Sequence, residues 1–187
     1  IAAVDLGGDP NLEIVLTSSN ASALTIFGWD GKNIMPVQYP LGIPGLTLNQ
    51  IIAADFDGDR KTDLAFLSNP SATPTTLIVG MNRPLRWDSF SFQVPDLVGT
   101  PDTELLSFDM NCDGRNDIVL NQFGPNPKTL IYYSNGGGMF IPKTLQGQQP
   151  AGAIAIGDLN GDSFPDLVVG RNSLNMISML NVLSGNK

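Results

Sequence analysis

Four acidic loops hold most of the side chains that could do chemistry in this chain. Three clear loops begin and end at an aspartate, over residues 55–63, 109–117 and 158–166, and a diverged loop covers residues 5–13. Each clear loop has oxygen-bearing side chains at its positions 1, 3, 5 and 9. Calcium takes six to eight oxygen ligands, and short loops supply them from alternate positions. The spacing therefore predicts calcium loops.

The predicted ligand set of each loop contains side-chain oxygens and the backbone carbonyl of position 7. Glycine at position 4, as in Gly58 and Gly161, lets the backbone wrap around an ion. The third loop has Cys112 there and Gly114 two positions later, and we expect this shift to change the turn without removing a ligand. The predicted ligands are Asp55, Asp57, Asp59, Lys61 (carbonyl) and Asp63; Asp109, Asn111, Asp113, Arg115 (carbonyl) and Asp117; Asp158, Asn160, Asp162, Phe164 (carbonyl) and Asp166; and Asp5, Asp9, Asn11 (carbonyl) and Glu13.

The charge of the chain agrees with metal binding at these loops. The net charge is -8, from 10 basic and 18 acidic residues, and this argues against nucleic acid or an anionic membrane as a partner. Thirteen of the acidic residues lie in the four loops. Crowded carboxylates repel one another unless a cation offsets them. The alternative is that the loops are exposed acidic turns. Because the first loop has Gly7 at position 3, we expect three to four Ca²⁺ ions.

The loops also mark a structural repeat. Their first aspartates are 50, 54 and 49 residues apart (55−5, 109−55 and 158−109). Short apolar runs precede the loops at residues 1–4, 51–54, 105–108 and 153–156, and follow them at 12–16, 64–67, 118–120 and 167–169. These runs lack polar alternation, which is typical of strands buried on both faces. Further strands are predicted at 23–29, 75–80, 128–133 and 175–183, and then at 33–38, 89–94 and 139–144.

Each repeat therefore reads as a four-stranded antiparallel meander whose first turn carries the acidic loop. Turn residues between the third and fourth strands lie at 30–31, 82–84, 135–138 and 184–186. The fold class is predicted to be all-β, a single β-propeller segment over residues 1–187. Its approximate blades are 1–50, 51–103, 104–149 and 150–187, and the last blade lacks its fourth strand. Further blades or another chain would complete the ring.

Other kinds of site find less support. An EF-hand would need flanking helices and a glutamate at position 12, where the clear loops have Phe66, Leu120 and Val169. The chain has no histidine, which excludes a Ser-His-Asp triad and a histidine zinc site. Nothing marks Asp102 and Glu104 as a glycosidase pair. We therefore predict that the chain is not an enzyme.

The three clear loops resemble FG-GAP/VCBS repeats, the calcium-loop blades of integrin alpha-subunit headpieces. The residues that carry the resemblance are Asp-Phe-Asp-Gly-Asp-x-x-x-Asp-Leu from Asp55, Asp-x-Asn-x-Asp-Gly-x-x-Asp-Ile from Asp109 and Asp-Leu-Asn-Gly-Asp-x-x-x-Asp-Leu from Asp158. The resemblance implies a propeller with a structural ion between the first two strands of a blade. It also implies an extracellular or cell-surface location and a role in adhesion or recognition. Arg60 stands where the family often has glycine.

Two further functions remain open at this point. Some propeller lectins resemble the same repeats, so the chain could be a calcium-dependent lectin that stacks sugars on Trp29, Trp87, Tyr132 or Tyr133. It could also be an accessory domain of a secreted polysaccharide-degrading enzyme. A protein or glycan ligand is the expected partner. Asn20 begins the one unblocked N-glycosylation sequon.

Overall fold

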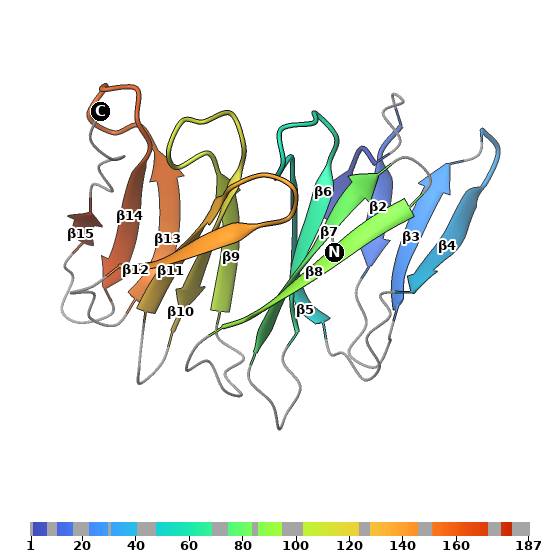
Figure 1. Cartoon of the computed structure of the whole chain (residues 1–187), viewed down its shortest axis with the longest axis horizontal. Helices are drawn as coiled ribbons and strands as arrows, with labels where there is room; N and C mark the ends of the chain where they lie inside the picture. The colour runs from blue at the N-terminus through green and yellow to red at the C-terminus, as the bar shows by residue number, and fades with distance from the viewer. Residues whose placement is uncertain are drawn as a thin grey trace. The chain divides into compact units, whose positions relative to one another are not determined.

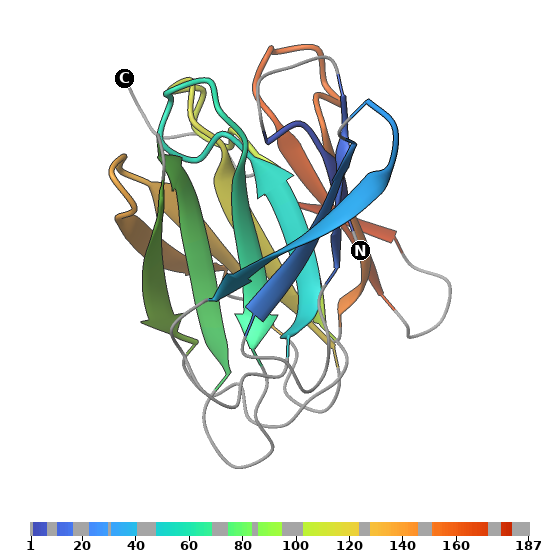
Figure 2. The same cartoon turned by 90° about the vertical axis from the view of Figure 1, so that its right-hand side faces the viewer.

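A computed structural model describes residues 2–6, 11–16, 23–29, 31–40, 48–68, 75–83, 86–94, 103–123, 128–145, 151–171 and 177–180. The regular structure in these ranges is β-strand throughout, and it forms antiparallel sheets (Figure 1). Figure 2 shows the strands within a sheet twisted relative to one another, as the chirality of L-residues requires. The described part of the chain offers no helix that could cross a membrane.

Each sheet is a meander in which consecutive strands pair antiparallel. The all-β class and the blade-like sheets are therefore confirmed. Among the described residues the fourth sheet has three strands. The first sheet contains β1 (Ala2–Val4), β2 (Glu13–Leu16), β3 (Ala23–Trp29) and β4 (Ile34–Pro40); the second β5 (Leu48–Ala54), β6 (Asp63–Ser68), β7 (Thr76–Arg83) and β8 (Arg86–Gln93); the third β9 (Thr103–Phe108), β10 (Asp117–Gln122), β11 (Lys128–Ser134) and β12 (Phe140–Leu145); and the fourth β13 (Ala151–Gly157), β14 (Asp166–Arg171) and β15 (Ile177–Leu180).

The turns between third and fourth strands match the prediction in one repeat and differ in another. Gly136, Gly137 and Gly138 all have positive φ, at 76°, 59° and 85°, so this glycine run forms the predicted turn. The turn predicted at 82–84 is misplaced, because β7 continues through Asn82 and Arg83. Pairing of these two residues with β8 extends the ladder beyond the point where their polarity suggested a loop. The turn predicted at 184–186 lies outside the described residues.

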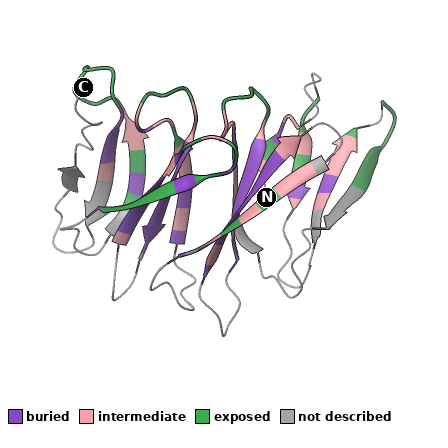
Figure 3. Cartoon of the chain, in the orientation of Figure 1, coloured by how far each residue is buried: buried purple, intermediate pink, exposed green. Residues whose placement is uncertain are grey.

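Burial confirms the prediction of two-sided packing for the strands that follow two of the acidic loops. Every residue of β6 and of β10 is buried. The strand β13 contradicts it, because Ile154 is buried whereas Ala153 and Ala155 are exposed. One face of β13 is therefore open, which its unbroken apolar sequence did not indicate. Figure 3 shows the burial of the described residues.

The chain divides into two compact units, and each has its own apolar core. The first unit contains Ile1–Asp55 and Asp59–Pro101, and the second contains Phe56–Gly58 and Asp102–Lys187. Sheets one and two thus form the first unit, and sheets three and four the second. The core of the first is Val4, Val15, Ile26, Leu64, Phe66 and Ile78; that of the second is Met110, Val119, Ile131, Leu145, Ile154 and Leu167.

Candidate metal centre

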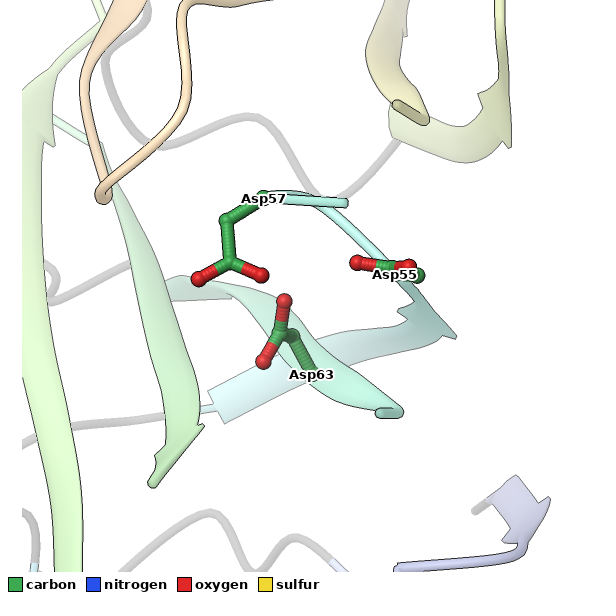
Figure 4. Close-up of side chains that lie close together, drawn as sticks. All are labelled: Asp55, Asp57 and Asp63. Atoms are coloured by element: carbon green, nitrogen blue, oxygen red, sulfur yellow. The ribbon is translucent and has the colours of Figure 1, made fainter. Parts of the chain in front are cut away.

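The loop between β5 and β6 brings three carboxylates together. Oxygen atoms of Asp55, Asp57 and Asp63 all lie within 4.8 Å of one another, and Figure 4 shows the three side chains converging. Asp55 and Asp57 are half-buried, and Asp63 is fully buried. Such an all-oxygen, anionic donor set suits a hard divalent cation. Among the described residues, no other three His, Cys, Asp or Glu side chains meet at this distance.

The carboxylate at position 9 ties each loop to the sheet below it. Asp63, Asp117 and Asp166 are at most 4% exposed, and each is the first residue of its sheet's second strand. Asp117 accepts the amide of Met110 at 2.9 Å and that of Ser134 in the third strand at 2.8 Å. These buried carboxylates accept backbone N–H groups, so their burial is partly offset without any cation.

The same pattern recurs in the other repeats. In the second, the amide of Asn82 donates to Asp63 at 2.8 Å, and in the fourth the amide of Leu159 donates to Asp166 at 3.0 Å. In the first, the amide of Leu6 donates to Glu13 at 2.7 Å. The longer glutamate thus reaches the amide that corresponds to Leu159. A hydrogen bond from a backbone amide to the position 9 carboxylate therefore recurs in all four repeats, including the diverged one.

In each clear loop, the carboxylates at positions 1 and 5 accept hydrogen bonds from the loop's own backbone amides. The amide of position 6 donates to the position 1 aspartate, at 2.7, 2.8 and 2.9 Å in the second, third and fourth loops. The amide of position 7 donates to the position 5 aspartate, at 2.9, 3.0 and 2.8 Å. The three loops therefore share the same backbone-to-carboxylate hydrogen bonds at positions 1 and 5.

Each clear loop has two residues with left-handed backbone. At position 4, φ is 84° in Gly58, 58° in Cys112 and 78° in Gly161. At position 6 it is 66° in Arg60, 85° in Gly114 and 71° in Ser163. The expectation that the shifted glycine changes the third turn is therefore wrong, because Cys112 adopts the glycine conformation. The second left-handed position was missed, although Gly114 and the departure at Arg60 both pointed to it.

Asp59, a predicted ligand, lies outside the carboxylate trio. Its Oδ2 is 3.1 Å from Nζ of Lys61 and 3.4 Å from a guanidinium nitrogen of Arg83. Burial raises the pKa of the Asp59 carboxyl, but hydrogen bonds from the Lys61 amide and ammonium, with the charge of Arg83, outweigh burial and lower that pKa. Lys61 donates its amide and its ammonium to Asp59, and the role predicted for its carbonyl stays a prediction.

In the third and fourth loops, the side chain of the position 3 asparagine donates a hydrogen bond to the position 5 aspartate. Nδ2 of Asn111 donates to Asp113 at 3.0 Å, and Nδ2 of Asn160 donates to Asp162 at 2.9 Å. Asp113 also pairs with the Arg115 guanidinium at 2.7 Å. Four of the predicted oxygen-bearing residues are therefore linked in pairs. Position 7 of the fourth loop, Phe164, donates its amide to Asp162.

The pKa of the buried Asp117 is clearly raised. Burial and the charges of Asp113 and Asp109 together raise its pKa to about 6, against the lowering effect of the two amides that it accepts. A nearby cation would act in the opposite direction and lower this pKa.

The first loop is described only in part. Residues 7–10, and so Asp9, lie outside the described residues, whereas Asp5 is half-buried and Asn11 is exposed.

Most of the aromatic and acidic residues outside the loops that could bind a sugar or act as a glycosidase pair are packed or hydrogen-bonded within the sheets. Trp87 packs against the core of the first unit, Tyr132 is 2% exposed and Tyr133 is half-buried. Trp29 is 48% exposed. Glu104 accepts the amide of Ile154 at 3.3 Å. Asp102 and Asn20 lie outside the described residues.

Comparison with known proteins identifies the repeat. A family model described as an FG-GAP-like repeat matches residues 109–169. That stretch runs from the first position of the third loop to β14, the strand that follows the fourth loop. No curated protein matches the chain. Residues 109–169 of this all-β chain are therefore similar to an FG-GAP-like repeat.

Proposed function

We propose that the chain is a calcium-binding, non-enzymatic recognition module of an extracellular or cell-surface protein, in which the ions stabilise the blades. The observation that carries this proposal is the convergence of Asp55, Asp57 and Asp63 within 4.8 Å in a loop whose backbone fold recurs twice more. A turn selected only for solubility has no need to direct three carboxylates at one point.

The donor chemistry favours calcium over other metals. Carboxylate oxygen is a hard ligand, and the trio contains neither nitrogen nor sulfur donors. Magnesium needs near-ideal octahedral geometry and keeps several waters, whereas calcium accepts irregular sets of oxygens. The three carboxylates of this loop, joined by backbone carbonyls or water, fit the more tolerant ion.

The position of the loops supports a structural role for the ion. The position 9 carboxylate belongs both to the loop and, through its backbone bonds, to the sheet, so an ion held there would brace both parts. Weak calcium modules with dissociation constants of about 10⁻⁴–10⁻³ M are filled outside cells. A partly exposed site of this kind suits such an environment. The FG-GAP-like repeat at residues 109–169 supports a blade that presents a binding surface for a protein or glycan.

Calorimetric titration of the whole chain with calcium tests the proposal, with thermal unfolding followed on the same sample before and after chelation. We expect three to four ions and a higher unfolding temperature with calcium. An ion at 100 times its dissociation constant adds about 2.7 kcal/mol per site. Magnesium at equal concentration is the matched control and should give a smaller shift. Absence of binding together with an unchanged unfolding temperature would refute calcium as the ligand.

A further inference from the structure

Two polar residues connect an acidic loop to the next repeat along the chain, and we call them the linking residues. They are Asn82 in β7 and Ser134 in β11. Leu64 and Ile118 each follow position 9 of a loop directly. Asn82 lies two residues beyond the partner of Leu64 in β7, and Ser134 lies two residues beyond the partner of Ile118 in β11. The linking residues therefore hold equivalent places in the second and third repeats.

The side chain of each linking residue donates a hydrogen bond to the loop of the preceding repeat. Nδ2 of Asn82 donates to the carbonyl of Leu6 at 2.8 Å, and Oγ of Ser134 donates to the carbonyl of Phe56. Leu6 and Phe56 both occupy position 2 of their loops. The two residues of the first bond belong to the first compact unit, and those of the second bond belong to the second unit. The same bond is thus made twice, by different donor groups.

The backbone of each linking residue is bonded to the loop of its own repeat. The amides of Asn82 and Ser134 donate to Asp63 and Asp117, the position 9 carboxylates, both at 2.8 Å. Ser134 is 4% exposed and Asn82 is half-buried, so water has limited access to compete for these bonds. One residue therefore bonds two loops, through its amide in its own repeat and through its side chain in the repeat before.

The residue at position 2 also packs against the sheet that carries the linking residue. Leu6 packs on the core cluster that contains Leu64 of the second sheet. The ring of Phe56 makes an edge contact with the ring of Phe140 in β12, with centroids 6.0 Å apart. The following sheet thus holds position 2 by both its side chain and its carbonyl. The placement of this part of the loop depends on how firmly the linking residue is fixed.

In the first unit these bonds form a continuous series between two loops. Asp63, a member of the carboxylate trio, accepts the amide of Asn82, whose side chain donates to Leu6. The amide of Leu6 donates in turn to Glu13, the position 9 carboxylate of the first loop, at 2.7 Å. An ion held by the trio would restrict Asp63 and so order the groups bonded to it. Ordering that one binding event has supplied need not be supplied again by the next.

We propose that the linking residues couple neighbouring acidic loops, so that an ion in one loop stabilises the loop of the preceding repeat. This inference rests on the calcium binding proposed above. Coupling between two binding sites is reciprocal, so calcium would fill neighbouring loops with positive cooperativity. Asn82 and Ser134 are positioning residues in this scheme, because they act on an ion only through a position 9 carboxylate.

Hydrogen exchange of single amides tests the coupling, followed by NMR on the whole chain in saturating calcium and in chelator. In the wild type, calcium should slow exchange at the amides of both Asn82 and Leu6. Asn82→Ala removes the side-chain donor but keeps the amide that bonds Asp63. The calcium effect at Leu6 should therefore shrink about 5-fold or more, the lower end of usual coupling factors. The calcium effect at the position 82 amide should persist.

Ser134→Ala is the matched control, because it breaks the equivalent bond in the other unit. It should reduce the calcium effect at the Phe56 amide and leave that at Leu6 unchanged, whereas Asn82→Ala should do the reverse. If the bond from Asn82 were only structural, Asn82→Ala would speed exchange at Leu6 equally in both buffers. An unchanged calcium effect at Leu6, with the position 82 amide still responding, would overturn the coupling but not the calcium site. Absence of any calcium effect at either amide of the wild type would overturn both.

Discussion

Replacing Asp57 by asparagine should change stability in opposite directions with and without calcium. Asp57 forms a trio with Asp55 and Asp63, so three carboxylate pairs lie within 4.8 Å. At an effective dielectric of about 20, each pair repels by roughly 3.5 kcal/mol. The substitution removes two of the three pairs. Since the trio is partly open to water, we discount the relief to about 1–2 kcal/mol. In a chelator, Asp57→Asn should therefore unfold at a higher temperature than the wild type.

With calcium present the order should reverse. At 100 times the dissociation constant, one bound ion adds about 2.7 kcal/mol to the free energy of unfolding, and the variant forfeits most of this. For a chain of this size 1 kcal/mol corresponds to about 2–4 °C. Because the variant keeps the gain of about 1–2 kcal/mol from reduced repulsion, the net loss is about 0.7–1.7 kcal/mol, and Asp57→Asn should then unfold roughly 1–7 °C below the wild type.

Differential scanning calorimetry in both buffers gives the two shifts directly. Asp88→Asn is the matched control: it makes the same change of charge in the same sheet, and Asp88 pairs with Arg83 at 3.8 Å rather than joining the trio. Its effect on the unfolding temperature should be equal in the two buffers. If Asp57→Asn behaves like this control, the trio does not hold an ion and the electrostatic reasoning fails.

Three further predictions concern the loops. Gly58→Ala should lower the free energy of unfolding by about 1–3 kcal/mol, measured by urea denaturation, because φ is 84° and the new Cβ would lie 3.3 Å from Cγ of Arg115. Gly31→Ala, with φ of 94° but open space around its Cβ, isolates the steric part and should cost less. Alkylation of the Cys112 thiol should be faster with calcium than with chelator. Burial and two neighbouring loop aspartates raise the pKa of this thiol, and a bound ion would offset the charge of the aspartates. Equal alkylation rates in the two buffers would contradict this. In chelator, the stabilising contribution of Asp117 should be full below about pH 4 and should be lost as the pH rises through about 6. The reason is that its folded-state pKa is raised to about 6 from the ordinary 3.8. Asp117→Asn should abolish this loss of stability in urea titrations between pH 4 and 7.

The sequence predicted the strands well because their signals are local. The strand at Ala23–Trp29 has the predicted limits, since apolar and β-branched residues fill it and turn residues bound it. The error at Asn82 and Arg83 has a non-local cause. Pairing with β8 keeps these polar residues in the ladder, and the Asn82 amide has a carboxylate to bond. Propensity gave no sign of that bond, since its partner is 19 residues away.

The candidate site was predictable in its composition and less so in its geometry. Spacing alone placed Asp55, Asp57 and Asp63 in one set, and they do converge. The spacing also included Asp59 in the ligand set, but its carboxylate accepts a hydrogen bond from Arg83, which lies 24 residues further along the chain. A one-dimensional pattern cannot show which cation the fold will bring to a carboxylate. It also hid the left-handed backbone of Cys112, because nothing in the residue type requires it.

A mechanical force on the third strand of the third sheet would be transmitted to the acidic loop of that sheet through one side chain. Ser134 in β11 and Met110 in the loop donate their amides to the same carboxylate, that of Asp117. If that carboxylate is released, both amides lose their acceptor at once, so the loop and the strand should exchange hydrogen with solvent as one cooperative element. An ion braced by this residue would govern how much load the blade bears before its strands part. Calcium concentration would then set mechanical strength in addition to thermal stability.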